Sequence, residues 1–387
     1  MFGRAGGHKA STCLCTNCCV RGNLITAFGD ATEPEPEPAV CVASRSSGAR
    51  GAGTPRYTEA CLKIRRKSGS IADAALPLID APTVISSEFF ALNGAHVILD
   101  DLGLAFAAAR AWGFNDFQYA SHQRKSGALD PLGGPAQAGD TTAPLMVQRQ
   151  RQLFRALYPS GVPTTAAGFC ARVIIAGTAI FNPRGAMGAE GSGRADPAQW
   201  SAFSAYLLRR LRLPPTRPRP PPGQERGGLV IAKKDPALRR AILNADELAS
   251  AACVRQLFAP VTLAAWESMS HLEAARLLQR SEMLLTPTGA SAFMALYMPT
   301  PSAVVYVPGD DRNDELYLDA LSHLLVRRYD SNAAEKVGEC TPGAEGQHAG
   351  CEQRHRIDAE RLCARLRTTW RDFAAMRGAG VWAQGEG

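Results

Sequence analysis

Short, wholly apolar runs separated by an apolar helical segment mark the second half of the chain. Met283–Thr286 and Ala303–Val307 have the length of strands, and Ser291–Met298 between them has the length of a helix that ends before Pro299. Strands that are apolar on both faces are typical of a parallel sheet covered by helices on both sides. The pattern therefore predicts a buried β-α-β unit.

The turn Thr288–Ala290 joins the first of these strands to the helix. In such a unit the turn lies at the carboxyl end of a strand and the amino end of a helix, where free backbone N–H groups and the helix dipole favour an anion. The turn therefore indicates either a phosphate site or an ordinary buried unit in which Thr288 caps the helix.

The segments before this unit continue the alternation of strands and helices. Gly228–Ala232 and Val254–Phe258 are predicted strands, and Ser270–Gln279 is a predicted helix that begins with a capping box formed by Ser270 and Glu273. Alternation of this kind predicts a parallel, doubly wound sheet.

The first half also mixes the two kinds of element. Its predicted strands are Thr83–Ser87 and Phe169–Ala176, and its predicted helices are an alanine-rich helix that ends near Trp112, Leu145–Tyr158 and Gln199–Leu213. The chain is thus predicted to be α/β, with two domains separated by a stiff, proline-rich linker.

The predicted domain organisation has five parts. They are an irregular, partly disordered, cysteine-containing stem (1–82) with a short strand at Asn23–Phe28, an amino-terminal Rossmann-like domain (83–213), a Pro-rich linker (214–228), a carboxy-terminal Rossmann-like domain (229–330), and a polar loop with a carboxy-terminal helix (331–387). That last helix, Ile357–Met376, is expected to pack back across the first domain.

Composition narrows the classes of partner. The 387 residues carry a formal net charge of +7 at pH 7, which suits anionic ligands. Much of the excess arginine lies in the Pro-rich stretch, so a nucleic-acid surface is not predicted, although a basic adaptor acting through Arg209–Pro222 is an alternative. No uncharged apolar window of about 18 residues predicts a transmembrane helix, and no apolar signal core or anchor is visible.

The 11 cysteines favour an oxidising compartment. Cys15 and Cys18 have the C-x-x-C spacing of a metal site, but no matching second pair with suitable spacing follows, so zinc is the less favoured interpretation. The odd count predicts a free thiol at Cys170 or Cys253.

Candidate acid and base groups gather before the alanine-rich helix. His96 and Asp100 are four residues apart and share one helical face, and Asp100 and Asp101 near a helix amino end are favourable with its dipole. The simpler alternative is an ordinary acidic helix start with one histidine. The chain has no Asp-x-Asp motif, so no metal is predicted.

Four stretches together resemble glycosyltransferase family 61. They are Asn93–Leu102 (Asn-x-x-His-x-x-x-Asp-Asp-Leu), the valine-rich strand after Cys170, the basic stretch that ends Arg240-x-x-x-Asn244-x-x-Glu247, and the Gly-Ala turn followed by MPTPSAVVYV. The resemblance covers about residues 83–330 and rests on the order and spacing of these motifs.

The resemblance implies a GT-B-like architecture, in which two Rossmann-like domains face each other across a cleft. It also implies inverting transfer of N-acetylglucosamine or a pentose from a UDP-sugar to a glycan or glycoprotein hydroxyl. The reaction would need no cofactor or metal, and the protein would act in the secretory pathway lumen, in the endoplasmic reticulum or Golgi.

The resemblance also implies roles for individual residues. The expected donor-binding residues are Lys233, Lys234, Arg240, Asn244, Thr288, Gly289, Ala290 and Ser291, with Arg240 and Lys234 on the diphosphate. The expected catalytic base is Asp101, with Asp100 as the alternative and His96 holding hydroxyl groups.

This sequence departs from the family pattern at two places. Thr288 stands where the family has histidine, and lysine replaces the strand-end arginine. Threonine hydrogen-bonds without carrying charge, and lysine lacks the bidentate fork of arginine. A catalytically impaired GT-B-like protein that binds a glycan or nucleotide is therefore the alternative function.

Overall fold

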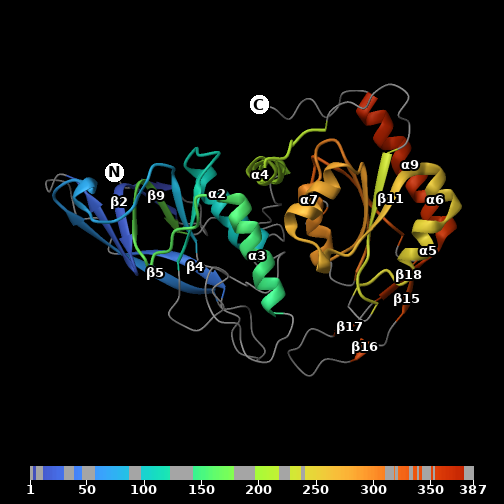
Figure 1. The fold of residues 1–387 in the computed structure, drawn as a ribbon, viewed down its shortest axis with the longest axis horizontal. Helices are drawn as coiled ribbons and strands as arrows, with labels where there is room; N and C mark the ends of the chain where they lie inside the picture. Colours follow the sequence, from blue (N-terminus) through green and yellow to red (C-terminus); the bar gives the residue numbers. More distant parts are fainter. Residues whose placement is uncertain are drawn as a thin grey trace. The chain divides into compact units, whose positions relative to one another are not determined.

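The structure is a computed structural model, and its chain divides into two compact units, Met1–Phe181 (unit 1) and Asn182–Gly387 (unit 2) (Figure 1). It describes residues 3–5, 12–29, 39–45, 57–86, 97–122, 143–177, 197–217, 227–236, 240–309, 318, 321–330, 334–337, 340–341, 350–351 and 354–378. The predicted α/β class is confirmed, because both units combine a sheet with helices.

Unit 1 is built on a mixed sheet of nine strands in the order β4-β5-β3-β2-β9-β7-β8, with β1 paired to β2 and β6 to β9. Its strands are β1 (Gly3–Ala5), β2 (Thr12–Arg21), β3 (Leu24–Phe28), β4 (Ala39–Arg45), β5 (Tyr57–Lys67), β6 (Leu78–Ile79), β7 (Thr83–Ser86), β8 (Gln118–Ser121) and β9 (Phe169–Gly177). β7 pairs in parallel with both β8 and β9, whereas β2 is antiparallel to β9 and β3.

Helices connect the parallel strands of unit 1. They are η2 (Val97–Gly103), α2 (Leu104–Ala111) and α3 (Ala143–Leu157), and a short helix η1 (Ile71–Asp73) precedes β6. On one face of the sheet α2 lies against β7 and β9, and α3 packs Phe154 on Tyr119 of β8. At the opposite edge β4 returns against β9 and β7, so the sheet curls and encloses an apolar cluster that includes Val20, Ile25 and Leu62.

The prediction of an irregular stem over 1–82 is wrong for the described residues, since β1 to β6 lie there. The predicted strand at Asn23–Phe28 is confirmed as β3. The strand β2 was missed because three of its four described buried positions, Cys15, Cys18 and Cys19, are cysteines and do not form an apolar run in the sequence. The alternating Glu-Pro run 33–38 lies outside the described residues, as does most of the Ser/Gly/Arg-rich segment 44–54.

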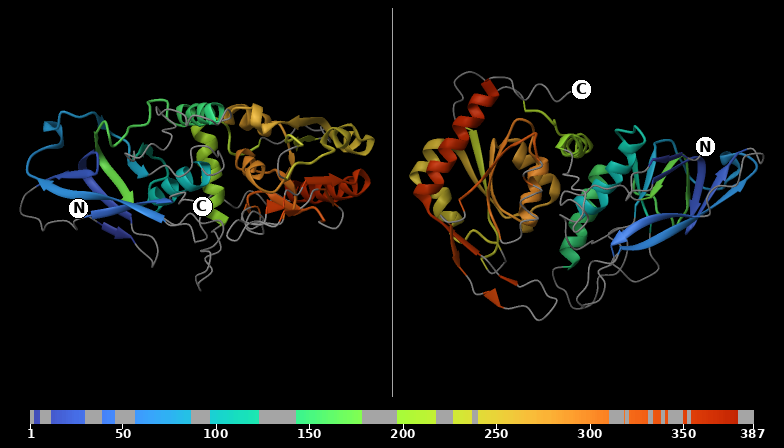
Figure 2. Two further views of the ribbon diagram at one scale, coloured as in Figure 1. Left: turned by 90° about the horizontal axis from the view of Figure 1, so that it is seen from below. Right: turned by 180° about the vertical axis from the view of Figure 1, so that it is seen from behind.

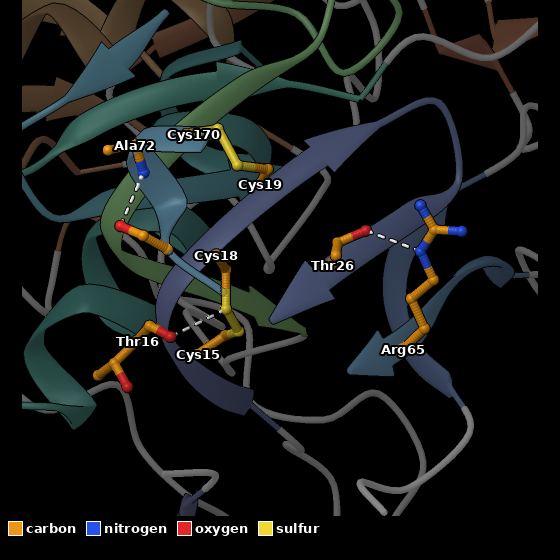
Figure 3. The surroundings of a disulfide bond; sticks show 9 residues. Cys15, Thr16, Cys18, Cys19, Thr26, Arg65, Ala72 and Cys170 are labelled. Carbon is orange, nitrogen blue, oxygen red and sulfur yellow. Dashed lines mark hydrogen bonds between the residues drawn. A yellow bond between two sulfur atoms is a disulfide. The ribbon is translucent and has the colours of Figure 1, made fainter. Parts of the chain in front are cut away.

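Each unit contains at least one disulfide bond of its own. Cys15 bonds to Cys18 within β2, Cys19 bonds across the sheet to Cys170 of β9 (Figure 3), and Cys253 bonds to Cys363 in unit 2. The predicted free thiols, Cys170 and Cys253, are therefore both oxidised. Their partners are 151 and 110 residues away, so spacing along the sequence could not reveal the pairs.

Unit 2 has a parallel sheet of five strands in the order β11-β10-β12-β13-β14. The strands are β10 (Gly227–Ala232), β11 (Phe258–Ala264), β12 (Met283–Pro287), β13 (Ala303–Val307) and β14 (Leu325–Arg328). The wholly apolar runs at Met283–Thr286 and Ala303–Val307 are thus adjacent central strands, as their burial on both faces requires.

Helices cover both faces of this sheet (Figures 1 and 2). Helices α5 (Ala245–Ser250), α6 (Ala252–Leu257) and α9 (Ala359–Gly378) pack against one apolar cluster of the sheet. The other described helices of the unit are α4 (Pro197–Arg210), η3 (Trp266–Ser268), α7 (His271–Gln279) and η4 (Ala290–Tyr297). The predicted helix at Ser291–Met298 is confirmed as η4, a 3₁₀ helix. Short β-ladders, β15 (Ala334–Val337) with β18 (Arg354–Ile357) and β16 (Cys340–Thr341) with β17 (Gly350–Cys351), precede α9.

Two predictions for unit 2 are wrong in detail. Val254–Phe258 was expected to be a strand, but α6 occupies it and the strand begins at Phe258. Pro260 lies within β11, at the end of the sheet order, where proline is tolerated. The carboxy-terminal helix packs on β13, β14 and α6 of unit 2 rather than on the first domain.

The boundary between the units falls at 181/182 and not in the Pro-rich stretch. Helix α4 belongs to unit 2, where the Ser204 hydroxyl donates to the Leu296 carbonyl at 2.8 Å. The described start of the stretch is docked as well, because Arg217 N–H donates to Thr300 O and the Arg217 guanidinium lies 3.5 Å from Glu282. This segment is thus part of a packed unit.

The capping box of α7 is confirmed, and it gives a first testable prediction. The Ser270 hydroxyl accepts from Glu273 N–H at 3.2 Å, and the Glu273 carboxylate accepts from Ser270 N–H at 2.8 Å. Ser270→Ala should lower the free energy of unfolding by about 1 kcal/mol in urea titrations. Ser268→Ala, which removes one exposed hydroxyl bonded to Ala265, is the control and should change it by less than about 0.5 kcal/mol.

Candidate anion site at the sheet switch point of unit 2

The direction of winding in unit 2 reverses at the carboxyl ends of β10 and β12. The chain leaves β10 for β11 on one side, then crosses to β12 on the other side of β10. In open α/β sheets, ligands bind where the direction of winding reverses, because the two connections diverge there. The predicted donor residues follow these two strands directly, Lys233 after β10 and Thr288 after β12.

Lys233 and Lys234 bring positive charge to the end of β10. The backbone N–H of Lys233 continues the ladder by donating to Ala264 O at 2.8 Å, which fixes its position. Its ammonium group lies 2.7 Å from the carboxylate of Asp246, and its side chain is 40% exposed. Lys234 is half-buried beside it.

Arg240 reaches the turn after β12 from a loop that precedes α5. A Cβ built on Gly289 would lie 2.5 Å from Arg240 Nη1 and 3.3 Å from its Cδ, so the guanidinium rests on the bare glycine. The loop is held from behind, since Leu243 N–H donates to His355 O and His355 N–H donates to Ala241 O, both at 2.8 Å. The structure thus brings the predicted residues Arg240 and Gly289 together.

Thr288 is buried, with 1% of its surface exposed, and its hydroxyl oxygen has no hydrogen-bond partner among the described residues. A Cβ built on Gly309, just after β13, would lie 2.6 Å from Thr288 Oγ1 and 3.6 Å from Arg240 Nε. The glycine therefore leaves space between the hydroxyl and the guanidinium. A buried hydroxyl without a partner is costly, so its retention points to a ligand that supplies one.

Gly289 begins η4 with a φ of +96°, which favours glycine. Ala290 and Ser291 form the first turn of that helix, where backbone N–H groups have no acceptor within the helix. Guanidinium, hydroxyl and helix start therefore meet around one turn. We call Arg240, Thr288, Gly289 and Gly309 the switch-point cluster.

Asn244, which was predicted to bind the nucleotide sugar, makes structural hydrogen bonds. Its side-chain amide donates to Ile357 O at 2.8 Å, and its side-chain oxygen accepts from Ile357 N–H at 3.0 Å. The residue is buried, so this pair ties the loop before α5 to β18. It acts on the switch-point cluster only by holding the loop that carries Arg240.

The predicted catalytic residues belong to unit 1. Asp100 and Asp101 lie in η2, so the expected helical start is confirmed there, but their side chains fall outside the described part of the chain. His96 also lies outside the described residues. The structure therefore leaves these roles as predictions.

A cavity of about 480 Å³ opens beside the edge strand β11, on the side of α5 and α6. Its walls include Asp246, Arg255, Phe258 and Leu263. None of its lining residues belongs to the switch-point cluster, and Asp246 in its wall is the ion-pair partner of Lys233.

Sequence reasoning missed Asp246 and Gly309. Asp246 reads as an acidic residue in a helix first turn, which is common, and Gly309 reads as a loop residue after a strand. Gly309 could have been found from its place just after β13, because the ends of adjacent parallel strands lie together at one edge of the sheet. Among the described residues no group of three metal-ligating side chains is found, and no helix of that part is long and apolar enough to cross a membrane.

Comparison of the sequence with protein-family models and with curated proteins found no match.

Thr288→Val separates a structural role of this hydroxyl from a binding role. Because Oγ1 has no partner among the described residues, the substitution should leave the free energy of unfolding unchanged or raise it by about 1 kcal/mol, while affinity for UDP, the ligand that the family resemblance implies, should fall about fivefold. Thr286→Val is the control, since that buried hydroxyl donates to Pro287 O at 3.0 Å. The control should lose stability and keep its affinity. A Thr288→Val protein that loses stability and binds UDP normally contradicts the assignment.

Proposed function

We propose that the chain is an inverting glycosyltransferase that takes its sugar from a UDP-sugar. Unit 2 would hold the nucleotide, with the diphosphate at the switch-point cluster. One observation carries the proposal, namely that Arg240 lies on Gly289 beside the unpartnered hydroxyl of Thr288 at the winding reversal of a parallel sheet. Guanidinium and backbone N–H groups are the donors that phosphate oxygens favour.

The proposed chemistry needs a base for the acceptor hydroxyl and stabilisation of the leaving diphosphate. In this proposal Arg240 and the lysines after β10 neutralise the leaving group, and the N–H groups of Ala290 and Ser291 donate hydrogen bonds to its oxygens. Asp101 of unit 1 would take the acceptor proton, with His96 holding hydroxyl groups and Asp100 as the alternative base.

The disulfides Cys19–Cys170 and Cys253–Cys363 support a secretory compartment, because such bonds persist where thiols are oxidised. The acceptor proposed for that compartment is a glycan or glycoprotein hydroxyl, and the sugar is N-acetylglucosamine or a pentose.

Calorimetric titration with a panel of UDP-sugars tests the proposal. One UDP-sugar should bind in the micromolar to millimolar range and be turned over, by transfer or slow hydrolysis, with release of UDP. A protein that binds none of the panel would refute the enzyme and the nucleotide-binding assignment together.

A binding protein with this fold and no catalysis is the second candidate. The charge of Lys233 is balanced by Asp246, 2.7 Å away, and Thr288 carries no charge where the family has histidine. The site therefore offers less positive charge to stabilise a leaving diphosphate than the family pattern would. This candidate predicts that a UDP-sugar binds and is neither transferred nor hydrolysed over hours. Measured release of UDP decides between the two.

A further inference from the structure

Strand β5 carries a line of cations on the outer face of the curled sheet of unit 1. Lys63, Arg65 and Lys67 are exposed, whereas Leu62 and Ile64, which alternate with Lys63 and Arg65 along the strand, pack into the enclosed apolar cluster. Alternation of side chains across a strand therefore puts the cations on one face, at intervals of about 6.7 Å along the chain.

Neighbouring strands add to this line. Leu24 of β3 pairs with Lys63 on one side and with Arg21 of β2 on the other, so exposed Arg21 lies on the same face. Among the described residues, Arg172 of β9 forms an ion pair on this face with Asp80. We call Arg21, Lys63, Arg65 and Lys67 the outer basic face; no ion pair to a described carboxylate is found for them.

Part of this face is held in place before any ligand arrives. Arg65 Nε donates to the Thr26 hydroxyl at 3.0 Å, across the parallel pair β3–β5 (Figure 3). Lys67 Nζ lies 5.9 Å from the centre of the Phe28 ring. Cations fixed by neighbours lose less conformational entropy when they bind an anion.

We propose that the outer basic face binds a sulfated polysaccharide. A row of evenly spaced cations is complementary to a polymer that carries repeated anionic groups, and a single small anion would use only one of them. The disulfide Cys19–Cys170 lies in the same sheet, and the oxidising compartments in which such bonds persist contain sulfated glycans rather than nucleic acid.

A lipid surface fits less well. Among the described residues Leu78 is the exposed large hydrophobic side chain, at 48%, and peripheral membrane binding needs buried apolar area as well as charge. The inference is independent of the proposed donor site in unit 2, since it uses residues of unit 1 alone.

The test is calorimetric titration of the full chain with a heparin-derived oligosaccharide at about 0.15 M salt. Binding should weaken about tenfold in the triple variant Arg21→Gln, Lys63→Gln, Lys67→Gln, because each exposed ion pair contributes a factor of roughly 1.5 to 5. The control is Arg276→Gln, Arg367→Gln, Arg371→Gln, which removes equal charge from exposed positions of unit 2. The control should bind within about twofold of the unchanged protein.

Three results would overturn the proposal. They are no binding of the oligosaccharide, an equal loss in both triple variants, and tighter binding to phosphatidylserine vesicles or to a single-stranded oligonucleotide than to the oligosaccharide. Circular dichroism of each variant confirms that the fold is intact, and all substituted side chains are exposed, so folding should be unaffected.

Discussion

Replacing Arg217 by alanine is expected to lower the free energy of unfolding by about 3–5 kcal/mol, the cost of removing one partner of a buried ion pair. The side chains of Arg217 and Glu282 are 8% and 14% exposed, and their charged atoms lie 3.5 Å apart. The guanidinium also donates to the carbonyls of Gln279 at 3.0 Å and Ser281 at 2.5 Å. Its loss would leave the Glu282 carboxylate without its countercharge and these carbonyls without the guanidinium donor.

Burial lowers the pKa of the Arg217 guanidinium, Glu282 raises it, and the nearby Arg377 lowers it. Burial has the largest effect on this pKa, so the charged guanidinium depends on its ion pair and hydrogen bonds to offset the loss of hydration. Glu282 is fixed in turn, since its carboxylate accepts from Gly228 N–H at 2.5 Å. The cluster thus joins the start of β10 to the loop before β12.

Urea unfolding followed by circular dichroism measures this effect. Arg255→Ala is a matched control, because that exposed arginine makes one side-chain bond, to Ala249 O at 3.3 Å, and its loss should cost less than about 1 kcal/mol. If Arg217→Ala costs no more than Arg255→Ala, the ion pair does not hold the segment after α4 to the sheet.

Gly289→Ala should reduce UDP affinity by about 30-fold with a loss of stability near 1 kcal/mol. The added Cβ would lie 2.5 Å from Arg240 Nη1, and the end of this flexible side chain is what must move. Displacement removes charge-assisted hydrogen bonds to the diphosphate, each worth about 1.5–3 kcal/mol. The stability cost comes mainly from the φ of +96°.

Gly161→Ala is the control for Gly289→Ala. Gly161 has a φ of +91°, and a Cβ added there meets nothing within 4 Å. The two variants should therefore lose similar stability in urea titrations, while UDP affinity falls in Gly289→Ala alone. Equal affinities would mean that Arg240 has no part in binding.

The sequence predicted unit 2 better than unit 1 for a physical reason. The strands of unit 2 are short, central and buried on both faces, so their apolar runs are continuous. In β2 of unit 1, cysteines fill core positions, and in β5 cations alternate with apolar residues, so neither strand has such a run. Pairing of β2 with β9, more than 140 residues later, is a long-range property that local pattern does not contain.

The candidate site was predicted in part. Residues that directly follow a strand, such as Lys233 and Thr288, were found because strand ends meet at one edge of a parallel sheet. Arg240 was selected from a resemblance, and the structure brings it onto Gly289. Asn244 was assigned to the donor, but the backbone of Ile357 uses its amide, and sequence spacing gives no sign of that partner 113 residues away.

Titration of UDP and of uridine tests the central claim most directly, because the two ligands differ only in the diphosphate. Binding at the switch-point cluster predicts that UDP binds at least about tenfold more tightly than uridine, and that Arg240→Gln removes most of this difference. Equal binding of UDP and uridine, or a difference that survives in Arg240→Gln, would contradict the claim that this cluster holds the diphosphate.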